Sequence, residues 1–436
     1  MLQFHRLTIP SLANLTLGIT SIATLAAGAH AQNVHVVDDS GGSGILFTQI
    51  QPAVTAAVDG DIILVKPGTY NQFTIQNKTL IITSDVAGGV LVDKGMKIMN
   101  LAASRSVTIR GMNTFGGEVQ PGLTCENNNG PIWIENCELS GNWLISPSFS
   151  DYTVHSGVSL DNCISVAFLN CKLIGGNFDT KPETQGGMGL NVINSDAVLY
   201  NSDCIGGKGG NGYDFVDNKG GHGGHGAVFS GGSLFASGSN FTGGKGGDSQ
   251  WNDDMDPKWP GGDGGHGLFL NNNNPTAFIV DCTFAGGAVG ANGGPYFGPQ
   301  PAPGLPTKIA TGTIQYSNEA ARTYSASSPV RENNNSVLTI NCNPGEFVSI
   351  LYSYGQDEET LIPAYSGDLL LTAHFSRELP LGHVPTGNAT FTFKMNNLPP
   401  TVQGRVLYTQ SLFTNTAMTY PVIGPASAIT ILDNSY

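Results

Sequence analysis

Five segments in the middle of the chain repeat one pattern. Each begins with glycine, alternates apolar and polar residues, passes a corner rich in asparagine or glycine, alternates again and ends in glycine. The segments are GLTCENNNGPIWIENCELSG from Gly122, GVSLDNCISVAFLNCKLIGG from Gly157, GLNVINSDAVLYNSDCIGG from Gly189, GAVFSGGSLFASGSNFTGG from Gly226 and GLFLNNNNPTAFIVDCTFAGG from Gly267. Alternation with a period of two is typical of β-strands, and a unit of two short strands cannot bury its apolar face alone. The repeat therefore predicts a parallel β-solenoid, in which successive copies stack over one continuous core.

Aligning the copies places like residues in columns along the predicted solenoid, and a weaker sixth copy begins at Gly95. Two columns are apolar and are expected to point inward: Ile134, Phe168, Leu199, Ala236 and Ile279, and Leu139, Leu173, Cys204, Phe241 and Phe284. The corner column reads Asn100, Asn127, Asn162, Asn194, Gly231 and Asn272. Asparagine tolerates left-handed backbone geometry and its amide can bond to the next copy, so we interpret this column as structural.

The seven cysteines fit the same arrangement. Cys137 and Cys171 share a column that Ser202, Ser239 and Cys282 continue. An odd number of cysteines without a short-range pairing pattern argues against a disulfide framework, while a single bridge between Cys137 and Cys171 stays open as an alternative. No Cys/His spacing typical of zinc is present. We therefore expect small buried thiols.

The composition excludes some classes of partner. Glycine accounts for 59 of 436 residues, charged residues for only 12% and hydrophobic residues for 40%, which is typical of a turn-rich β protein and not of a disordered chain. The net charge is −14, or −15 once Arg6 is removed with the N-terminal segment. Because so acidic a surface repels nucleic acid, we expect no nucleic-acid partner, and an acidic polysaccharide would need local basic residues or bound calcium.

Residues 1–31 have the pattern of a secretory signal peptide. A basic start with Arg6 precedes an apolar stretch, and a small-x-small cleavage site ends at Ala31. A membrane anchor is the alternative, but Pro10 interrupts the stretch, and no later segment has the ~20 apolar residues that span a bilayer. We expect cleavage after Ala31 and a secreted or cell-surface protein whose mature chain has no membrane span.

The segment before the repeats supplies a resemblance. The run IQPAVTAAVDGDIILVKPGTYNQFTIQNKTLIIT, within residues 33–83, reads as a short capping helix, a strand, a Pro-Gly turn at Pro67 and a second strand. Together with the repeats, it resembles the right-handed parallel β-helix proteins of the pectin-lyase-like superfamily, over about residues 33–294. The resemblance implies a fold and not one activity, because that superfamily includes lyases, hydrolases, epimerases and proteins with no known chemistry.

The composition changes after the last repeat. Five prolines crowd the stretch after residue 294, and short apolar runs such as SVLTINCN and RVLYTQSLF follow, with turn residues between them. About 100 residues of this kind fit a small antiparallel β-sandwich. The expected fold is all-β, a right-handed parallel β-helix followed by that sandwich, in the order signal peptide 1–31, β-helix 32–294, Pro-rich linker 295–335 and β-sandwich 336–436.

Two long loops in the repeat region share one layout. GGKGGNGYDFVDNKGGHGGHG begins at Gly206, and GGKGGDSQWNDDMDPKWPGGDGGHG begins at Gly243. Counting from both ends pairs Lys208 with Lys245, Asn211 with Asp248, His222 with Asp263 and His225 with His266. If the copies stack, the paired residues lie about one strand spacing apart, ~4.8 Å.

These glycine-rich loops have a structural and a functional interpretation. Gly-Gly-x repeats can pack as extended threefold chains with every x exposed, so that Lys and His are only tolerated there. Alternatively, loops on one side of a solenoid form its binding face. The ligand-binding candidates are then His222, His225, His266, Trp251 and Trp259. The candidate calcium ligands are the carboxylates of Asp248, Asp253, Asp254, Asp256 and Asp263, whose spacing matches no fixed calcium loop.

Two functions follow from these candidates. The first is a binding or structural protein outside the cell, which recognises an extracellular polysaccharide or cell-envelope component and requires no cofactor. The second is a calcium-assisted polysaccharide lyase, whose base removes the proton next to a uronate carboxylate. The candidate catalytic residues are Lys208, Lys245, His225, His266 and Arg110. A glycoside hydrolase is a further alternative, with Glu126 and Asp161 aligned on adjacent copies, but the superfamily's hydrolase motifs are not recognisable.

Overall fold

The structure is a computed structural model that describes residues 32–42, 44–116, 120–141, 155–178, 183–212, 219–249, 259–293, 299–361, 367–372, 377–415 and 421–436. The expected signal peptide, residues 1–31, lies outside this part of the chain. Residues 31–436 form one compact unit, and the regular secondary structure of its described residues is β-strand apart from one short helix. Within the described ranges, no helix combines the length and the apolar character that a membrane span requires.

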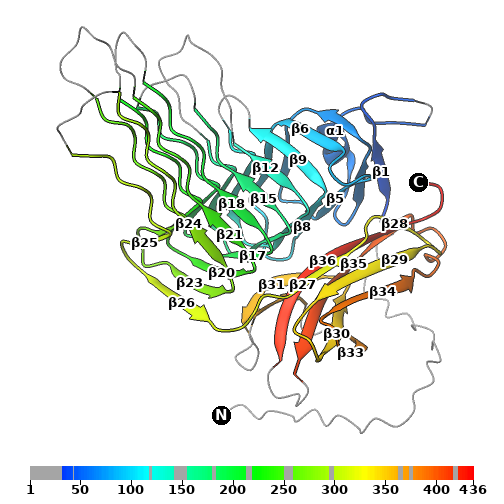
Figure 1. The fold of residues 1–436 in the computed structure, drawn as a ribbon. Coiled ribbons are helices and arrows are strands. Elements are labelled where there is room, and N and C mark those ends of the chain that lie inside the picture. The colour runs from blue at the N-terminus through cyan, green and yellow to red at the C-terminus, as the bar shows by residue number, and fades with distance from the viewer. Residues whose placement is uncertain are drawn as a thin grey trace. The chain divides into compact units, whose positions relative to one another are not determined.

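Three parallel sheets, A, B and C, run side by side along the chain up to Ser317 (Figure 1). Sheet A contains β1 (Val34–Val37), β2 (Ile62–Val65), β5 (Leu80–Ser84), β8 (Val107–Arg110), β11 (Ile132–Glu135), β14 (Val166–Leu169), β17 (Ala197–Tyr200), β20 (Ser233–Ser237), β23 (Thr276–Val280) and β26 (Thr313–Ser317). Its strands are rich in Val, Ile, Leu and aromatic residues, which favour extended backbone.

Sheets B and C supply the other two sides of each coil. Sheet B contains β3 (Gly68–Tyr70), β6 (Val90–Lys94), β9 (Met112–Gly116), β12 (Glu138–Ser140), β15 (Lys172–Ile174), β18 (Asp203–Ile205), β21 (Asn240–Thr242) and β24 (Thr283–Ala285). Sheet C contains β4 (Phe73–Gln76), β7 (Met96–Met99), β10 (Leu123–Asn128), β13 (Val158–Cys163), β16 (Leu190–Ile193), β19 (Ala227–Ser230), β22 (Leu268–Leu270) and β25 (Thr307–Ile309).

The chain visits sheets A, B and C in turn, so that three strands make one coil and each strand pairs with its copies in the neighbouring coils. This arrangement confirms the predicted parallel β-helix, but each repeat holds three strands and not the two expected, because the residues before its final glycine form a short strand of sheet B. The strand registers also confirm the two inward columns, Ile134–Phe168–Leu199–Ala236–Ile279 and Leu139–Leu173–Cys204–Phe241–Phe284. All of these side chains belong to one continuous core, with Phe284 partly exposed near its end.

Asparagines turn the chain between sheets C and A. Asn127, Asn162 and Asn194 have positive φ values of 54°, 52° and 43°, which asparagine tolerates better than most residues. Asn162 Nδ2 donates to Asn127 Oδ1 over 3.4 Å, as the predicted ladder requires. In a later coil the ladder uses Asn273 and not the expected Asn272: Asn273 Nδ2 donates to Asn194 Oδ1 over 3.3 Å. The longer corner between β22 and β23 shifts the stacked residue by one position.

The predicted cysteine column is present as a ladder of small side chains, buried except for the partly exposed Cys282 at its end. Cys171 N donates to Ser202 Oγ over 3.0 Å, Ser202 N to Ser239 Oγ over 3.1 Å, and Ser239 N to Cys282 Sγ over 3.4 Å. In each case, the side chain of one column residue accepts the backbone N–H of the column residue in the preceding coil. Cys137 and Cys171 are free thiols, so the alternative of a bridge between them is not realised.

A short helix covers the N-terminal end of the solenoid core. Helix α1 (Ile50–Ala56) buries Ile50, Ala53 and Val54 against the first coil. The ammonium group of Lys78 donates to the carbonyl oxygens of Val54 and Ala57 over 2.8 and 2.6 Å. These bonds satisfy carbonyls that the helix end leaves without intrahelical partners.

The segment expected to be a Pro-rich linker, residues 295–335, carries strands instead. β25 and β26 complete one more coil, so the solenoid continues to Ser317, and β27 (Thr323–Ala326) and β28 (Val330–Arg331) follow. Pro303 and Pro306 lie in the last loop before β25. Proline favours an extended threefold conformation, which is the conformation that this loop needs, so the prolines do not mark the end of the repeats.

The C-terminal strands form antiparallel sheets with a core of their own, as predicted. The first sheet contains β27, β29 (Asn335–Asn341) and β34 (Asn388–Lys394). The second contains β28, β36 (Val422–Leu432), β35 (Gly404–Thr414), β30 (Glu346–Ser353) and β33 (Arg377–Val384), with β28 parallel to β36. β31 (Gln356–Leu361) and β32 (Asp368–Leu371) form a separate pair.

β35 and β36 pack on the outer face of sheet A. Trp133 of β11 lies edge-on to Tyr408 of β35, with ring centroids 5.4 Å apart. Leu169, Tyr200 and Phe235 of sheet A belong to the same buried cluster as residues of β35 and β36. Because one face of sheet A lines the solenoid core and the other meets these strands, strands such as β11 and β14 are buried along their whole length.

Candidate binding surface

From β12 to β25, the long loops between the described strands leave the solenoid at the corner between sheets B and C (Figure 1). Each loop has an outgoing limb that continues a sheet B strand and a returning limb that leads into the next sheet C strand. The described outgoing limbs are residues 175–178, 206–212, 243–249 and 286–293, and the described returning limbs are residues 183–189, 219–226, 259–267 and 299–306. We call these eight limbs the polyglycine array.

Backbone hydrogen bonds in the array repeat every three residues. In the outgoing layer, the amides of Gly206, Gly209 and Gly212 donate to the carbonyls of Thr242, Lys245 and Asp248, over 2.8 to 3.0 Å. In the returning layer, Gly220, Gly223 and Gly226 donate in the same way to Pro260, Asp263 and His266. The second glycine of a Gly-Gly-x triplet bonds across the layers; for example, Gly244 N donates to Gly224 O over 2.8 Å. The limbs therefore form two hydrogen-bonded layers of extended threefold chains, the packing predicted from the Gly-Gly-x pattern.

Close approach between limbs explains the glycines. A Cβ atom on Gly207 would lie 1.9 Å from Gly176 O, and one on Gly244 would lie 2.0 Å from Gly207 O. Both contacts are far shorter than a van der Waals contact, so any side chain would force the limbs apart. The glycines are buried and the third residue of each triplet is at least partly exposed, with the buried-buried-exposed pattern repeating along limbs 206–212 and 219–226.

The third residue of a triplet directs its own N–H outward, where the limbs offer no carbonyl. This N–H donates to the side chain of the matching residue in the preceding loop, where that side chain has an acceptor atom. The observed pairs are Lys208 N to Asn177 Oδ1, Asp248 N to Asn211 Oδ1, Ala291 N to Asp248 Oδ1, Asp263 N to His222 Nδ1, His266 N to His225 Nδ1, Ala302 N to Asp263 Oδ1 and Leu305 N to His266 Nδ1. The polar side chains thus continue the hydrogen bonding of the array.

His225 and His266 form a stacked pair on the returning layer. Their rings stack with centroids 4.9 Å apart and an interplanar angle of 3°, and Phe269 of β22 lies edge-on to both rings. Because a backbone N–H can only donate, each Nδ1 acts as an acceptor, and the proton of the neutral ring is on Nε2. Burial lowers the pKa of His225 to about 4, aided by the charges of His266, Lys308 and His222.

The paired residues of the outgoing layer also meet as the alignment predicts. Asp248 N donates to Asn211 Oδ1 over 2.9 Å, and Gly209 N, the amide next to Lys208, donates to the carbonyl of Lys245 over 3.0 Å. Within its own loop, Lys245 Nζ also donates to Asp248 Oδ1 over 2.8 Å. Burial acts to raise the pKa of Asp248, but its hydrogen bonds from Lys245 and from Ala291 N outweigh that effect and lower the pKa. Asp248 is therefore a carboxylate that is already bonded to an ammonium group and a backbone amide.

The structure separates Arg110 from the other catalytic candidates. Arg110 is buried where β35 and β36 cover sheet A; its guanidinium is 3.2 Å from Glu135 Oε1 and donates to the carbonyls of Ala326 and Ser328. Glu135 also accepts from Ser427 Oγ over 2.6 Å and from Ala428 N over 2.8 Å. This ion pair joins sheet A to the C-terminal strands and does not face the loops.

Several candidates fall outside the described residues. They are Trp251, Asp253, Asp254 and Asp256. Trp259 is described and is 36% exposed at the start of a returning limb. Within the described ranges, no group of three or more His, Cys, Asp or Glu side chains could hold a metal ion. The two calcium candidates that are described, Asp248 and Asp263, each accept a backbone N–H, from Ala291 and Ala302, over 2.7 Å.

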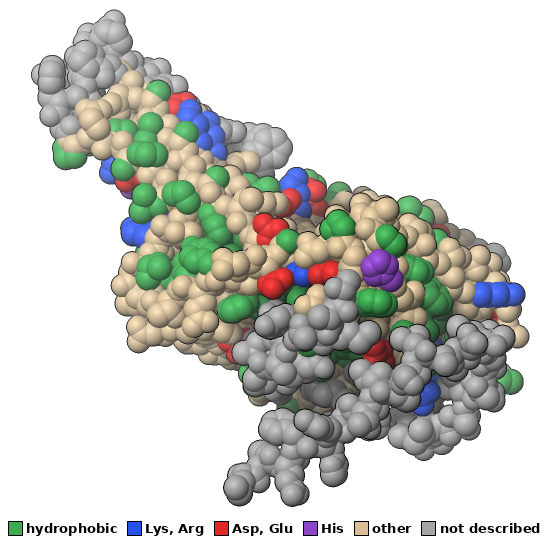
Figure 2. All heavy atoms as spheres, turned by 60° about the horizontal axis from the view of Figure 1, so that its bottom comes forward, with side chains coloured by type: hydrophobic (Ala, Val, Ile, Leu, Met, Phe, Trp, Pro, Cys, Tyr) green, Lys and Arg blue, Asp and Glu red, His purple; other side chains and the backbone are tan. Residues whose placement is uncertain are grey.

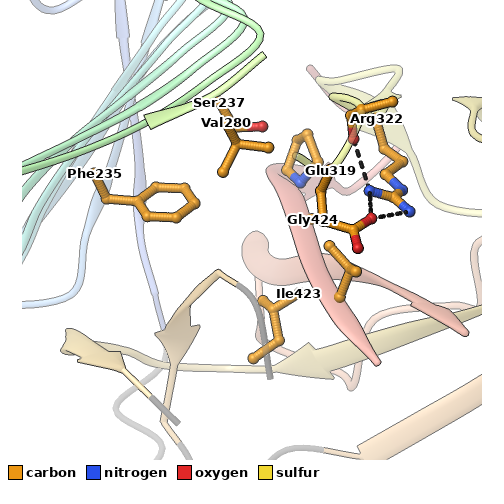
Figure 3. Close-up of a pocket in the computed structure, with 10 residues that line it drawn as sticks. Phe235, Ser237, Val280, Glu319, Arg322, Ile423 and Gly424 are labelled. Carbon is orange, nitrogen blue, oxygen red and sulfur yellow. Dashed lines mark hydrogen bonds and ion pairs between the residues drawn. The ribbon is translucent and has the colours of Figure 1, made fainter. Parts of the chain in front are cut away.

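A small cavity lies in the contact between sheet A and β36 (Figure 3). Phe235 and Val280 of sheet A, Ile423 of β36 and the ion pair of Arg322 with Glu319 surround it, with 3.2 Å between Arg322 Nη1 and Glu319 Oε2. Its volume is about 10 Å³, enough for about one water molecule and too small for a sugar ring. The cavity belongs to the packing between the solenoid and the C-terminal strands.

Basic side chains lie close to acidic ones on the surface, although the net charge is −14. On the face drawn in Figure 2, acidic and basic side chains of the described residues lie in small mixed groups. Ion pairs of the described residues include Lys66 with Asp85, Arg331 with Asp85, and Lys97 with Glu126, each at an N–O distance of 2.9 Å. The pair Glu126 and Asp161, considered for a hydrolase, lies at matched positions of β10 and β13, and Lys97 already neutralises Glu126.

Two residues of the surface were not predicted. Phe269 packs against both histidine rings, and the ammonium of Lys308 lies over the Phe269 ring at 4.9 Å from its centroid. Phe269 is the outward residue of GLFL and follows the end of the returning limb by two residues. Lys308 is its partner in β25. The alternation of the repeat identifies both as outward positions of sheet C, beside the histidine row.

Comparisons with known proteins give little similarity. No family model matches the chain, and no curated protein matches it. Among solved structures, a superoxide reductase (neelaredoxin) from Ignicoccus hospitalis aligns with 26% of this chain and 80% of its own chain, at 12% sequence identity and a TM-score of 0.15. A likeness at that score supports no statement about fold or function, so the assignment rests on the geometry of the polyglycine array.

Proposed function

We propose that this protein is a secreted or cell-surface binding protein, and that it recognises an extracellular polysaccharide or another glycan of the cell envelope along the returning layer of the polyglycine array. The observation that carries this proposal is the row of stacked imidazoles, His225 and His266, held beside Phe269 by backbone bonds. Side chains that are fixed before the ligand arrives lose little conformational entropy on binding.

The chemistry of this row suits an oxygen-rich ligand. Since Nδ1 of each ring is occupied by a backbone N–H, each neutral ring has an Nε2–H left to donate. Sugar hydroxyls accept such bonds, and Lys308 next to Phe269 adds a cation that can contact a hydroxyl or carboxylate. Equivalent donors on successive coils lie about one strand spacing apart, ~4.8 Å, so the row presents a repeating pattern to a linear polymer.

A glycan array tests the proposal. We expect the purified protein to bind a polysaccharide, and the double variant His225→Asn/His266→Asn to bind it about tenfold more weakly. Two neutral hydrogen bonds of ordinary strength account for a loss of that size. Asparagine keeps a side-chain oxygen that can accept the outward N–H, as Asn177 and Asn211 do in the outgoing layer. The variant therefore removes the imidazoles with little change in the array.

The outgoing layer supplies the matched control. Lys208→Ala/Lys245→Ala removes two cations from the same loops but from the opposite layer, and we expect its binding to equal that of the unaltered protein. No binding to any glycan on the array, or a loss confined to the lysine variant, would contradict the proposal.

A further inference from the structure

The two layers of the array satisfy their outward N–H groups with different chemistry. In the outgoing layer the observed acceptors are Asn177, Asn211 and Asp248. In the returning layer three of the four observed acceptors are imidazole nitrogens, those of His222, His225 and His266, and the fourth is Asp263. The amides of Asn177 and Asn211 cannot be protonated in the physiological range, and the hydrogen bonds of Asp248 from Lys245 and Ala291 N lower the pKa of its carboxyl, whereas an imidazole can be protonated there. Mild acid therefore acts on one layer only.

Protonation of His225 or His266 removes a bond and creates a repulsion. An imidazolium has a hydrogen on both nitrogens, so Nδ1 can no longer accept and its N–H would point at the donor N–H of His266 or Leu305. The two rings are stacked, so a second charge would lie within 4.9 Å of the first. Both consequences favour separation of the returning limbs.

The groups around the pair oppose protonation in the closed array. The charged and titratable groups that face His225 are His266, Lys308 and His222, and all three lower its pKa, after burial as the main cause. Burial is also the main cause of the lowered pKa of His266, where Lys308 lowers the pKa further and Asp263 raises it. Phe269, in edge contact with both rings, brings no charge.

His222 differs from this pair. Its Nδ1 is 3.3 Å from Asp263 Oδ2 as well as 3.1 Å from Asp263 N, and the imidazole is half exposed. A protonated His222 can donate to the Asp263 carboxylate and exchange one bond for another. The acid response therefore belongs to His225 and His266, which are nearer to sheet C than His222.

We infer that the returning layer is an acid-sensitive switch: proton uptake by His225 and His266 breaks their bonds to the backbone and opens the returning limbs, while the outgoing limbs keep the bonds within their own layer. As a regulatory device for the surface described above, this rests on the proposed function, because opening would disperse the histidine row and release its ligand in acid. The opening itself does not depend on any ligand.

The direction of the effect follows from linkage. Both histidines have a lower pKa in the closed array than the ~6.5 of an exposed histidine, so the open form takes up more protons. The contribution of these residues to closure is complete above ~pH 6.5 and is lost progressively as the pH falls toward about 4, where His225 titrates in the closed form. Within that window the opening equilibrium rises ~10-fold per pH unit for one histidine and up to ~100-fold for both.

Glycine-selective NMR measures this opening residue by residue. Amide exchange, corrected for the intrinsic effect of pH, is compared at pH 7 and pH 5 in protein labelled with ¹⁵N-glycine. We expect the protection of Gly223, Gly226, Gly264 and Gly267, which donate within the returning layer, to fall at least tenfold. We expect Gly206, Gly209, Gly243 and Gly246, which donate within the outgoing layer, to change much less. Equal changes in the two layers, or none, would overturn the inference.

The variant His225→Asn/His266→Asn keeps the acceptors and removes the protonation. We expect its returning layer to be protected to the same degree at pH 7 and pH 5, and a loss of protection like that of the unaltered protein would reject the histidines as the cause. Should the double variant fail to fold, the imidazole tautomers of the unaltered protein give an independent check by long-range ¹H–¹⁵N NMR. Protons on Nδ1 of both rings at pH 7 would refute the switch.

Two measurements keep this inference separate from the proposed function. Exchange is recorded without ligand, so an acid-sensitive returning layer together with an empty glycan array would retain the switch and reject the ligand. Binding to a glycan with no difference in exchange between pH 7 and pH 5 would retain the ligand and reject the switch.

Discussion

At the scale of single residues, the array depends on positions where only hydrogen fits at Cα. The glycines at these positions are not needed for a left-handed φ; they are needed because two backbones approach each other there, as at Gly244 and Gly207. A lysine can occupy the next position, Lys245, because that side chain points out of the layer. The order of residues within each triplet therefore decides which substitutions the array accepts.

Gly244→Ala should disrupt the array. The new Cβ would lie 2.0 Å from Gly207 O, and the limbs must separate to relieve the contact. Overpacking of this kind costs about 1–3 kcal/mol of stability. We expect a lower thermal midpoint and faster exchange of the amides in residues 243–249. Lys245→Ala is the matched control and should leave both quantities unchanged; equal behaviour of the two variants would show that the limbs are not tightly packed.

At the scale of elements, one buried ion pair joins sheet A to β36. Arg110 and Glu135 are 6% and 0% exposed at their side chains, and Glu135 also bonds to Ser427 and Ala428. Removing one partner of a buried pair leaves an uncompensated charge, which costs more than removing both. The pair therefore has a structural role: it holds the C-terminal strands against sheet A.

Glu135→Ala should lower the free energy of unfolding by about 3–5 kcal/mol, because it leaves the Arg110 guanidinium buried without its carboxylate. The double variant Arg110→Met/Glu135→Leu should recover much of this loss, since well-packed apolar side chains replace both charges. Chemical denaturation monitored by Trp fluorescence gives the comparison. A single variant as stable as the unaltered protein, or a double variant no better than the single one, would show that the pair adds nothing to this contact.

The inward register of the solenoid could be predicted, whereas the third strand of each coil and the contact with β35 and β36 could not. The period-two alternation fixes which residues face inward, so the register from Ile134 to Ile279 follows from alignment alone. The column that starts at Arg110 continues with Glu135, Leu169 and Tyr200. Such a mixture of charged and apolar residues is typical of a solvent-exposed face. What buries it lies some 200 positions or more away in sequence, as the bond between Thr108 and Tyr408 shows, with a separation of 300 residues.

The array was predicted in part for a similar reason. Equal spacing from both ends of each loop pairs His225 with His266 and Asn211 with Asp248, and these pairs are in contact. The role of the side chains as backbone acceptors was not predicted, because it depends on the direction of the N–H at each third position. Asn272 was assigned to the corner ladder in place of Asn273 because sequence alignment does not show where a longer corner inserts its extra residue.

At the scale of the whole molecule, the C-terminal sheets are the cover of the solenoid's apolar flank. Trp133, Leu169, Tyr200 and Phe235 on sheet A are buried in the same cluster as β35 and β36. A chain that ends after β26, at Ser317, would expose this continuous apolar strip to water. Monomeric soluble proteins rarely expose apolar patches of that extent, because the patches cause association.

We expect such a shortened chain to associate. Light scattering should show oligomers or aggregates at concentrations where the full chain is monodisperse, and a dye that fluoresces in apolar surroundings should bind strongly to it. The full chain with Glu135→Ala serves as a control for instability without loss of the cover. A shortened chain that stays monodisperse and binds no dye would show that the strip tolerates water.

The repeated bonding between loops of the array also has a consequence for the evolution of such a protein. Successive loops of the array are joined by the same pattern of backbone donors and acceptors, as the bonds of Gly209 N to Lys245 O and of Gly246 N to Ala288 O illustrate. A tandem duplication of the DNA for one coil would insert a new pair of limbs whose backbone groups are matched on both sides. The array can therefore lengthen by whole coils through a single genetic event, without a change of fold.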